Sequence, residues 1–199
     1  MQCPSCHQAA GSGLICSACG AILPARIVDA FDALGVEPRF DVPADELETR
    51  FRELSRKLHP DRFAKAAPKE RMLSLQAATT LNDSYRKLKQ PLRRAEALLA
   101  RGGVTIAETD RVGPEFLMEM MELGEAIHDA RDAGDAAALA AATGVVQGKR
   151  EAAMAQLADR LAAKDLAEAK EQLVAIRYFD RLLEAGEPRD AAMTGEGKL

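Results

Sequence analysis

The stretch RFRELSRKLHPDRF, residues 50–63, predicts an amphipathic helix that ends in a rigid turn. Its apolar residues, counted from position 47, recur at offsets of four, seven and eleven, which places them on one face of a helix. These residues are Leu47, Phe51, Leu54 and Leu58. The proline at position 60 disfavours the helical conformation at His59 and has no amide donor of its own. We therefore expect the helix to stop at His59 and the segment 59–61 to be held in a turn.

The charges of the chain are segregated into two regions. Residues 50–71 contain eight Lys or Arg against three Asp or Glu, whereas residues 115–132 contain six Asp or Glu against one Arg. This segregation predicts two surfaces with different partners. A nucleic-acid partner is not expected, because no stacking aromatic residues or groove-entering motif accompany the basic region.

A second helix is expected over 69–89, after a basic connector, and it would pair with the first as an antiparallel hairpin. Its inward-facing residues are expected among Met72, Leu75, Thr79, Leu81, Asn82, Tyr85 and Leu88. This arrangement resembles the J-domain of the Hsp40 co-chaperones, in which a His-Pro-Asp loop joins two antiparallel helices. The resemblance implies that the loop and the basic helix bind a DnaK-like ATPase chaperone and stimulate its ATP hydrolysis. The residues that it assigns to this site are His59, Pro60, Asp61, Arg50, Arg52, Arg56, Lys57 and Arg62.

The segment 81–99 narrows the resemblance. Its sequence, LNDSYRKLKQPLRRAEALL, has the Asn, Tyr, Leu, Pro-Leu-x-Arg-Ala and Leu-Leu pattern of the HscB (Jac) type of J-protein, which serves iron–sulfur cluster assembly. The chain departs from the common pattern at Arg62, where Lys is more frequent, and at Ala97, where an aromatic residue often stands. The resemblance covers residues 25–185 and implies that the chaperone partner is of the HscA type.

Four cysteines near the N-terminus predict a metal site. Cys3, Cys6, Cys16 and Cys19 form two Cys-x-x-Cys pairs separated by nine residues, a spacing that lets four thiolates converge on one Zn²⁺. Two disulfides are disfavoured in a reducing compartment, and a redox Cys-x-x-Cys would need a βαβ context that is missing. An iron centre with the same four sulfurs remains an alternative. We expect one structural zinc per chain, because four protein ligands leave no open coordination position.

The composition predicts an all-α fold. Helix-forming residues dominate, Trp is absent, and aromatic residues make up 4% of the chain. No run of about 18 apolar residues is present, so we expect no membrane segment and a cytoplasmic location. The expected organisation is a four-cysteine zinc module (1–23), a J-domain (24–100), a hinge (101–113), a C-terminal three-helix bundle (114–186) and a flexible tail (187–199).

The acidic helix of the C-terminal domain carries a second candidate surface. Leu117, Met118 and Met121 fall on the side of this helix opposite its expected core stripe, together with Glu122, Glu125 and Asp129. Packing of this side against other helices is one interpretation, and a partner-binding face is the other, for which adaptable Met side chains are suited. The HscB resemblance favours the second, because in that family the matching positions and an aromatic residue on the last helix, here Tyr178, bind the IscU scaffold protein.

No catalytic constellation is evident, and we expect an adaptor rather than an enzyme. The three histidines have no nucleophile or carboxylate dyad in sequence context, and there is no Gly-rich phosphate loop. A general J-domain co-chaperone for unfolded clients is the alternative function, although the Gly/Phe-rich linker and β-rich client domains of that class are absent. A zinc-ribbon nucleic-acid regulator is disfavoured, because residues 1–23 contain no Lys, Arg, Asp or Glu.

Overall fold

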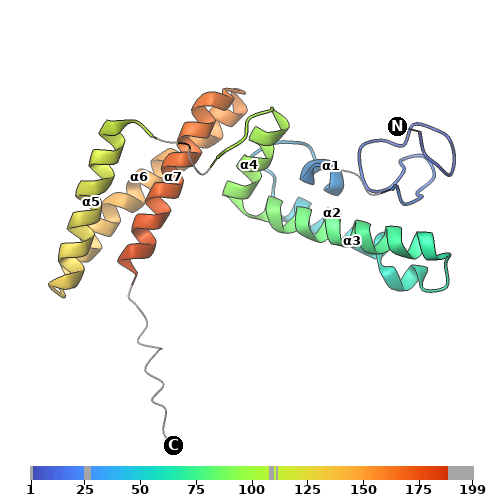
Figure 1. Cartoon of the computed structure of the whole chain (residues 1–199), viewed down its shortest axis with the longest axis horizontal. Helices are drawn as coiled ribbons and strands as arrows, with labels where there is room; N and C mark the ends of the chain where they lie inside the picture. The colour runs from blue at the N-terminus through green and yellow to red at the C-terminus, as the bar shows by residue number, and fades with distance from the viewer. Residues whose placement is uncertain (1, 25–27, 108–109, 111, 188–199) are drawn as a thin grey trace, which may run out of the picture. The chain divides into compact units, whose positions relative to one another are not determined.

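The computed structural model describes residues 2–24, 28–107, 110 and 112–187. Within these residues the chain forms seven α-helices and one 3₁₀ helix and no β-strand, which confirms the predicted all-α class (Figure 1). The elements are α1 (Ala30–Leu34), α2 (Ala44–Leu58), η1 (Pro60–Phe63), α3 (Pro68–Lys89), α4 (Pro91–Arg101), α5 (Pro114–Asp132), α6 (Ala136–Ala162) and α7 (Leu166–Gly186). The expected tail falls, from residue 188 onward, outside the described residues.

The chain divides into two compact units. One comprises the residues up to 105 together with 161–166, and the other comprises 106–160 and the residues from 167 onward. None of the described helices is long and apolar enough to cross a membrane.

The hairpin of α2 and α3 is the centre of the first unit. Proline defines the N-terminal side of both helices: Pro43 precedes α2, and Pro68 is the first residue of α3. Leu47 and Leu58 of α2 are buried, and the ring of Phe51 stacks on Tyr85 of α3 with centroids 4.3 Å apart. The predicted apolar stripe of α2 therefore faces α3 and the core.

The inward face of α3 differs in part from the prediction. Leu81 and Leu88 are buried as expected, but Met72 and Leu75 are exposed by 56% and 59%. The buried positions follow a spacing of three and four residues and include small side chains: Ser74, Ala77, Leu81, Ser84 and Leu88. Small residues allow a close approach at the turn, where the Ser74 hydroxyl donates a 2.7 Å hydrogen bond to the Leu58 carbonyl. The inward face of α3 is therefore the one that carries these small residues, and Met72 and Leu75 fall outside it.

The helix α4 and the loop before α2 are joined by a buried arginine. Arg94 donates hydrogen bonds to the carbonyls of Phe40 and Val42, at 2.8 and 3.0 Å. Burial lowers the pKa of Arg94, and the charge of Asp41 opposes this shift. These bonds satisfy loop carbonyls that burial would otherwise leave unpaired, so α4 holds the start of α2 in place.

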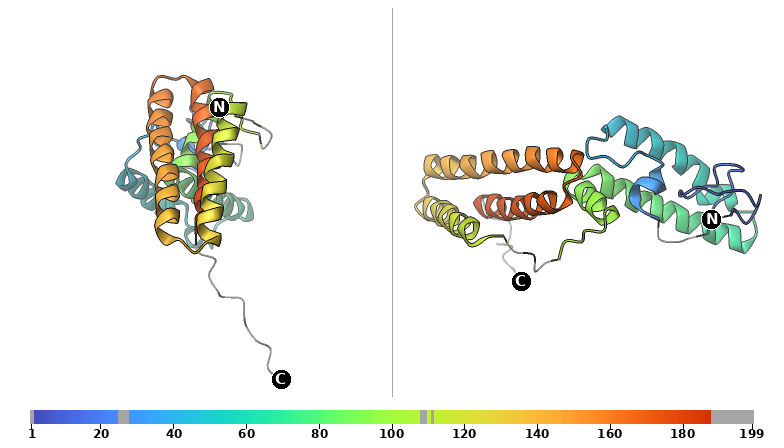
Figure 2. Two further views of the ribbon diagram at one scale, coloured as in Figure 1. Left: turned by 90° about the vertical axis from the view of Figure 1, so that its left-hand side faces the viewer. Right: turned by 90° about the horizontal axis from the view of Figure 1, so that it is seen from above.

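Helices α5, α6 and α7 make up most of the second unit, and helices that are consecutive in the chain run antiparallel (Figure 2). Both turns use the left-handed conformation, at Gly134 and at Lys164, and the Asp135 side chain caps α6 by accepting from two of its first amides. Gly124 of α5 lies where an added Cβ would contact Leu182 of α7, at 3.4 Å. The buried large side chains include Met120, Ile127, Val146, Leu157, Leu173, Ile176 and Phe179. The core thus takes one stripe from each helix.

Candidate functional site

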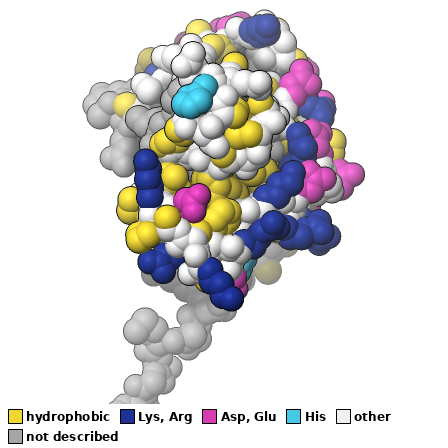
Figure 3. Space-filling model, turned by 90° about the vertical axis from the view of Figure 1, so that its right-hand side faces the viewer, with side chains coloured by type: hydrophobic (Ala, Val, Ile, Leu, Met, Phe, Trp, Pro, Cys, Tyr) yellow, Lys and Arg dark blue, Asp and Glu magenta, His cyan; other side chains and the backbone are white. Residues whose placement is uncertain are grey.

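The His-Pro-Asp segment forms the turn between α2 and α3. His59 is the residue that precedes η1, and its Nδ1 accepts a 3.3 Å hydrogen bond from the Asp61 amide. Arg62 donates back to the Arg56 carbonyl at 3.2 Å, which ties η1 to the last turn of α2. The Asp61 side chain is 90% exposed and the His59 side chain 55% exposed. The backbone of the turn is therefore fixed while both polar side chains are exposed. In the space-filling view of Figure 3, Lys and Arg side chains gather in a band along one side of the face that is shown.

The basic side chains that precede this turn differ in how far other residues of the protein engage them. Arg50 is committed to internal contacts, because its guanidinium donates to the Gly35 carbonyl at 2.9 Å and pairs with Glu53. Arg52 pairs with Glu48 one turn earlier in α2. Arg56 contacts the backbone of its own helix, and Lys57 is exposed. Of the eight residues assigned to the chaperone site, Arg50 has the clearest structural role.

The four cysteines lie together. Their sulfur atoms are all within 4.8 Å of one another, with 3.7 Å between Cys3 and Cys19 and 3.8 Å between Cys6 and Cys16. A tetrahedral site with metal–sulfur bonds of about 2.3 Å has sulfur–sulfur edges of about 3.8 Å. All four cysteines are free thiols, and these separations are too long for disulfides. The donor set and its spacing therefore fit a four-thiolate metal ion.

The two Cys-x-x-Cys turns share one backbone design. In each turn the residue after the second cysteine has a left-handed conformation, His7 with φ of 60° and Gly20 with φ of 75°. Its amide donates to the carbonyl of the first cysteine, at 2.9 Å in both turns. The two turns therefore close in the same way, and together they bring all four sulfurs into one cluster.

The environment of the sulfurs favours thiolate at one position and opposes it at another. Backbone hydrogen bonds at Cys6 and Ser5 lower the pKa of Cys3 to about 6. The backbone at Gln8 acts in the same direction on Cys6, but burial and the three neighbouring sulfurs raise the pKa of that thiol to about 12. Four thiolates at this distance would repel one another, and a bound divalent cation would offset the repulsion and keep all four ionised.

The acidic side of α5 presents two exposed methionines. Met118 and Met121 are 63% and 66% exposed, and Leu117 is half-buried at the edge of the core stripe. The predicted acidic residues of this face are all exposed: Glu122, Glu125 and Asp129. Exposed large apolar residues are few in the described part of the chain, so this pair marks an unusual surface.

Tyr178 of α7 is half-buried and has aromatic contacts that the sequence patterns did not reveal. Its ring meets Phe116 of α5 edge-on, with centroids 5.8 Å apart, and the Arg181 guanidinium lies 4.4 Å from its ring centroid. Phe116 also contacts Phe179, which is buried. No local pattern predicts these contacts, because they join residues about sixty positions apart.

Comparisons with known proteins agree on one family. Residues 112–186 match the family model described as the HSCB C-terminal oligomerisation domain. The co-chaperone protein HscB homolog of Neisseria meningitidis is 33% identical over 154 residues, which cover 76% of this chain and 93% of that protein. The homolog of Vibrio vulnificus is 40% identical over 114 residues, which cover 56% of this chain and 67% of that protein.

A solved structure extends the likeness to nearly the whole chain. The crystal structure of human co-chaperone protein HscB superposes with a TM-score of 0.77 at 30% sequence identity, and the match covers 92% of this chain and 95% of that one. The Neisseria relative reaches a similar identity and is covered over nearly its full length. The chain belongs to the family of HscB co-chaperones.

Proposed function

We propose that the protein is a two-ended adaptor between a DnaK-like chaperone of the HscA type and an iron–sulfur scaffold protein of the IscU type. The observation that carries this proposal is the turn at His59–Asp61, which has a fixed backbone and a 90% exposed Asp61 carboxylate. The proposal assigns to this turn the stimulation of ATP hydrolysis, and to the acidic face of α5 the binding of the scaffold. Cluster transfer to recipient proteins follows from bringing the two partners together.

The chaperone contact would combine charge with a defined carboxylate. Residues 50–71 carry a strong excess of positive charge, which would guide an acidic partner surface by long-range attraction. Within that encounter Asp61 would accept hydrogen bonds from a basic group of the partner. The bond from Arg62 to the Arg56 carbonyl keeps the turn from rearranging, so little ordering is needed on binding.

The scaffold contact would combine apolar anchors with negative charge. Met118 and Met121 would enter apolar hollows of the partner, and Glu122, Glu125 and Asp129 would face basic groups around them. Tyr178 would add an aromatic surface that Phe116 and Arg181 already hold in one orientation. Binding both partners to one chain raises the effective concentration of each for the other.

For the four-cysteine module we propose zinc in a structural role. With four sulfurs as ligands no coordination position is open to substrate, so the ion would supply folding free energy and no chemistry. Mass spectrometry under native conditions should find one zinc per chain, lost when Cys16 and Cys19 are both changed to Ser. Iron with the same ligands in the isolated protein would contradict the assignment.

The function is tested by ATP hydrolysis in the partner chaperone. Asp61→Asn keeps the size of the side chain and removes its charge, and it should abolish stimulation while the helical content stays unchanged. Asp41→Asn is the matched control, because Asp41 is also exposed, by 83%, and lies outside the turn. Full stimulation by Asp61→Asn would contradict the J-domain assignment.

Scaffold binding is tested separately. Met118→Ala combined with Met121→Ala should weaken binding to the scaffold protein at least about tenfold, whereas Met72→Ala, at a similarly exposed methionine of α3, should not. The family model describes this region as an oligomerisation domain. If the double variant changes the association of the chain with itself and leaves scaffold binding intact, the α5 face serves self-association and the scaffold assignment is wrong.

A further inference from the structure

The cysteine module shares a hydrophobic core with the α2–α3 hairpin. Leu14, in the loop between the two Cys-x-x-Cys turns, is 7% exposed and belongs to the same buried cluster as Phe31 and Leu34 of α1. Ile15 and Ile22 of the module pack against this cluster. Phe31 and Leu34 are fully buried, and Leu14 of the module packs in the same cluster. The module therefore supplies part of the J-domain core.

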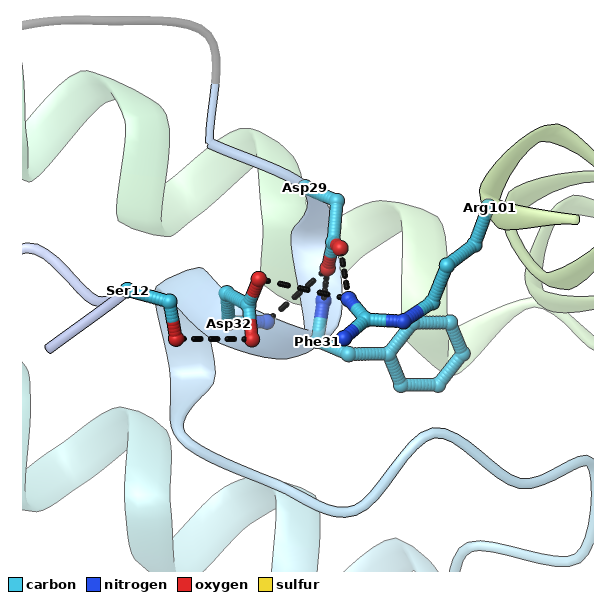
Figure 4. Close-up of polar contacts among 5 residues, drawn as sticks. All are labelled: Ser12, Asp29, Phe31, Asp32 and Arg101. Atoms are coloured by element: carbon cyan, nitrogen blue, oxygen red, sulfur yellow. Dashed lines mark hydrogen bonds and ion pairs between the residues drawn. The ribbon is translucent and has the colours of Figure 1, made fainter. Parts of the chain in front are cut away.

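A polar chain joins the module to the end of α4 through α1 (Figure 4). The Ser12 hydroxyl donates to Asp32 Oδ1 at 3.0 Å. On the other side, Arg101 donates to Asp32 Oδ2 at 3.2 Å and to Asp29 Oδ2. Asp29 Oδ1 meanwhile accepts from the amides of Phe31 and Asp32, both at 2.9 Å, and so caps α1. Two carboxylates thus connect three separate parts of the unit.

The module also approaches the backbone of α1 closely. A Cβ added at Gly13 would lie 3.1 Å from the Asp32 carbonyl oxygen, which is a backbone atom that cannot move aside without shifting the helix. The ion pairs of Arg101 with Asp29 and Asp32 are also favourable. Burial lowers the pKa of Arg101, but its hydrogen bonds and charge interactions with Asp32 and Asp29 raise that pKa more. The contact is therefore close and electrostatically matched.

Neither of the two joined elements is stable alone. α1 has five residues, fewer than an isolated helix needs in water, and depends on its cap and its packing. The module has few buried apolar residues beyond its cysteines, and such modules fold only with their metal. We propose that metal binding at Cys3, Cys6, Cys16 and Cys19 and the folding of α1 onto the hairpin are thermodynamically linked, through the Leu14 contact and the Ser12–Asp32–Arg101 chain.

This linkage makes the metal site a determinant of the J-domain. Loss of the metal, by chelation or by oxidation of the thiols, would unfold the module, withdraw Leu14 from the core and remove the Ser12 bond from Asp32. α1 would then no longer pack stably against α3. Linkage is reciprocal: metal binding favours docked α1 by the same factor by which docked α1 favours metal binding, so a change that undocks α1 must weaken metal binding. The inference concerns this unit alone and holds whichever partners the protein has.

The test uses a residue that is remote from the cysteines. Arg101→Gln, in the full-length chain, removes the guanidinium that bridges Asp29 and Asp32. Zn²⁺ affinity, measured by competition with a chromophoric chelator at fixed pH, should fall about fivefold or more. Arg93→Gln is the matched control: Arg93 lies on the same helix and pairs with Glu96, one turn away on that helix. Its affinity should stay within about twofold of the wild type.

Hydrogen exchange supplies the second readout. Removing Zn²⁺ from the wild-type chain should increase exchange of the α1 amides and of the α3 residues packed on them, and leave α5–α7 unchanged. Two results would overturn the linkage: exchange confined to residues 2–24 after metal removal, or wild-type Zn²⁺ affinity in Arg101→Gln. Neither measurement involves ATPase stimulation, so failure here is distinguishable from failure of the proposed function.

Discussion

The substitution Ser74→Ala probes how the hairpin holds the His-Pro-Asp turn. The Ser74 side chain is fully buried, and its hydroxyl donates to the carbonyl of Leu58, the last residue of α2 before His59. This carbonyl is one of those at the end of a helix that have no partner within it. Ser74 therefore satisfies a buried acceptor one residue away from the His-Pro-Asp turn.

The expected loss of stability follows from two opposing effects. A buried carbonyl that loses its donor costs about 1–3 kcal/mol. Alanine is a better helix former than serine, which returns about 0.5 kcal/mol. The lost hydrogen bond therefore dominates, and the first unit should be destabilised by about 1–2 kcal/mol. For a unit of about 100 residues this corresponds to a fall in Tm of about 4–16 °C.

The assay can be restricted to the first unit. The chain has no Trp and two tyrosines, of which Tyr85 lies in the first unit and Tyr178 in the second. In a Tyr178→Phe background, tyrosine fluorescence during urea unfolding reports the first unit alone. Thr79→Ala is the control, because the Thr79 hydroxyl bonds within its own helix, to Leu75, and is exposed. It should be neutral or slightly stabilising.

A stable Ser74→Ala variant would refute the reasoning. If its urea midpoint equals that of the wild type, the Leu58 carbonyl finds another partner and Ser74 is not what holds the turn. If Thr79→Ala costs as much as Ser74→Ala, the loss reflects removal of any hydroxyl from α3. The expected result is a clear difference between the two variants.

Two further predictions concern a carboxylate and a turn. The hydrogen bonds from Lys170 and the Ala107 amide lower the pKa of Asp110, so this carboxylate stabilises the fold above the ordinary aspartate pKa, and the stabilisation is lost as pH falls through the lowered value. Asp110→Asn should therefore lower the free energy of unfolding of the second unit at neutral pH. In urea titrations at several pH values, the variant should also show a smaller loss of stability on acidification than the wild type. His7→Gly should be neutral or tighten Zn²⁺ binding, because glycine adopts the left-handed conformation of this position without strain. Gly20→Ala should weaken Zn²⁺ binding, because it places a side chain at a left-handed position. Equal effects of the two substitutions on Zn²⁺ affinity would show that φ at these turns is unimportant.

Features set by neighbouring residues were predictable from the sequence. The end of α2 at His59 follows from Pro60, and the bounds of α3 agree with the predicted range 69–89 to within one residue. The cysteine cluster was predictable for a chemical reason: two Cys-x-x-Cys pairs on a short uncharged segment have few other uses. Identification of the family used the same local motifs.

Features set by contacts between distant residues were not predictable. Met72 and Leu75 are exposed because α3 turns inward a face that includes small residues, whereas a pattern based on apolar size assigns these two to the core. The bonds to Asp32 from Ser12 and from Arg101 join positions twenty and sixty-nine apart. Neither serine nor arginine at these positions carries a local signal of the contact.

Single-turnover ATP hydrolysis by the HscA-type chaperone tests the central claim most directly. It should be measured with this chain at subsaturating concentration, with and without the scaffold protein. We expect wild type to stimulate hydrolysis and the scaffold to increase that stimulation. The double change Met118→Ala and Met121→Ala should keep the basal stimulation and lose the increase, and Asp61→Asn should lose both. Stimulation by Asp61→Asn, or a scaffold-dependent increase that survives the methionine changes, would contradict the two-ended adaptor.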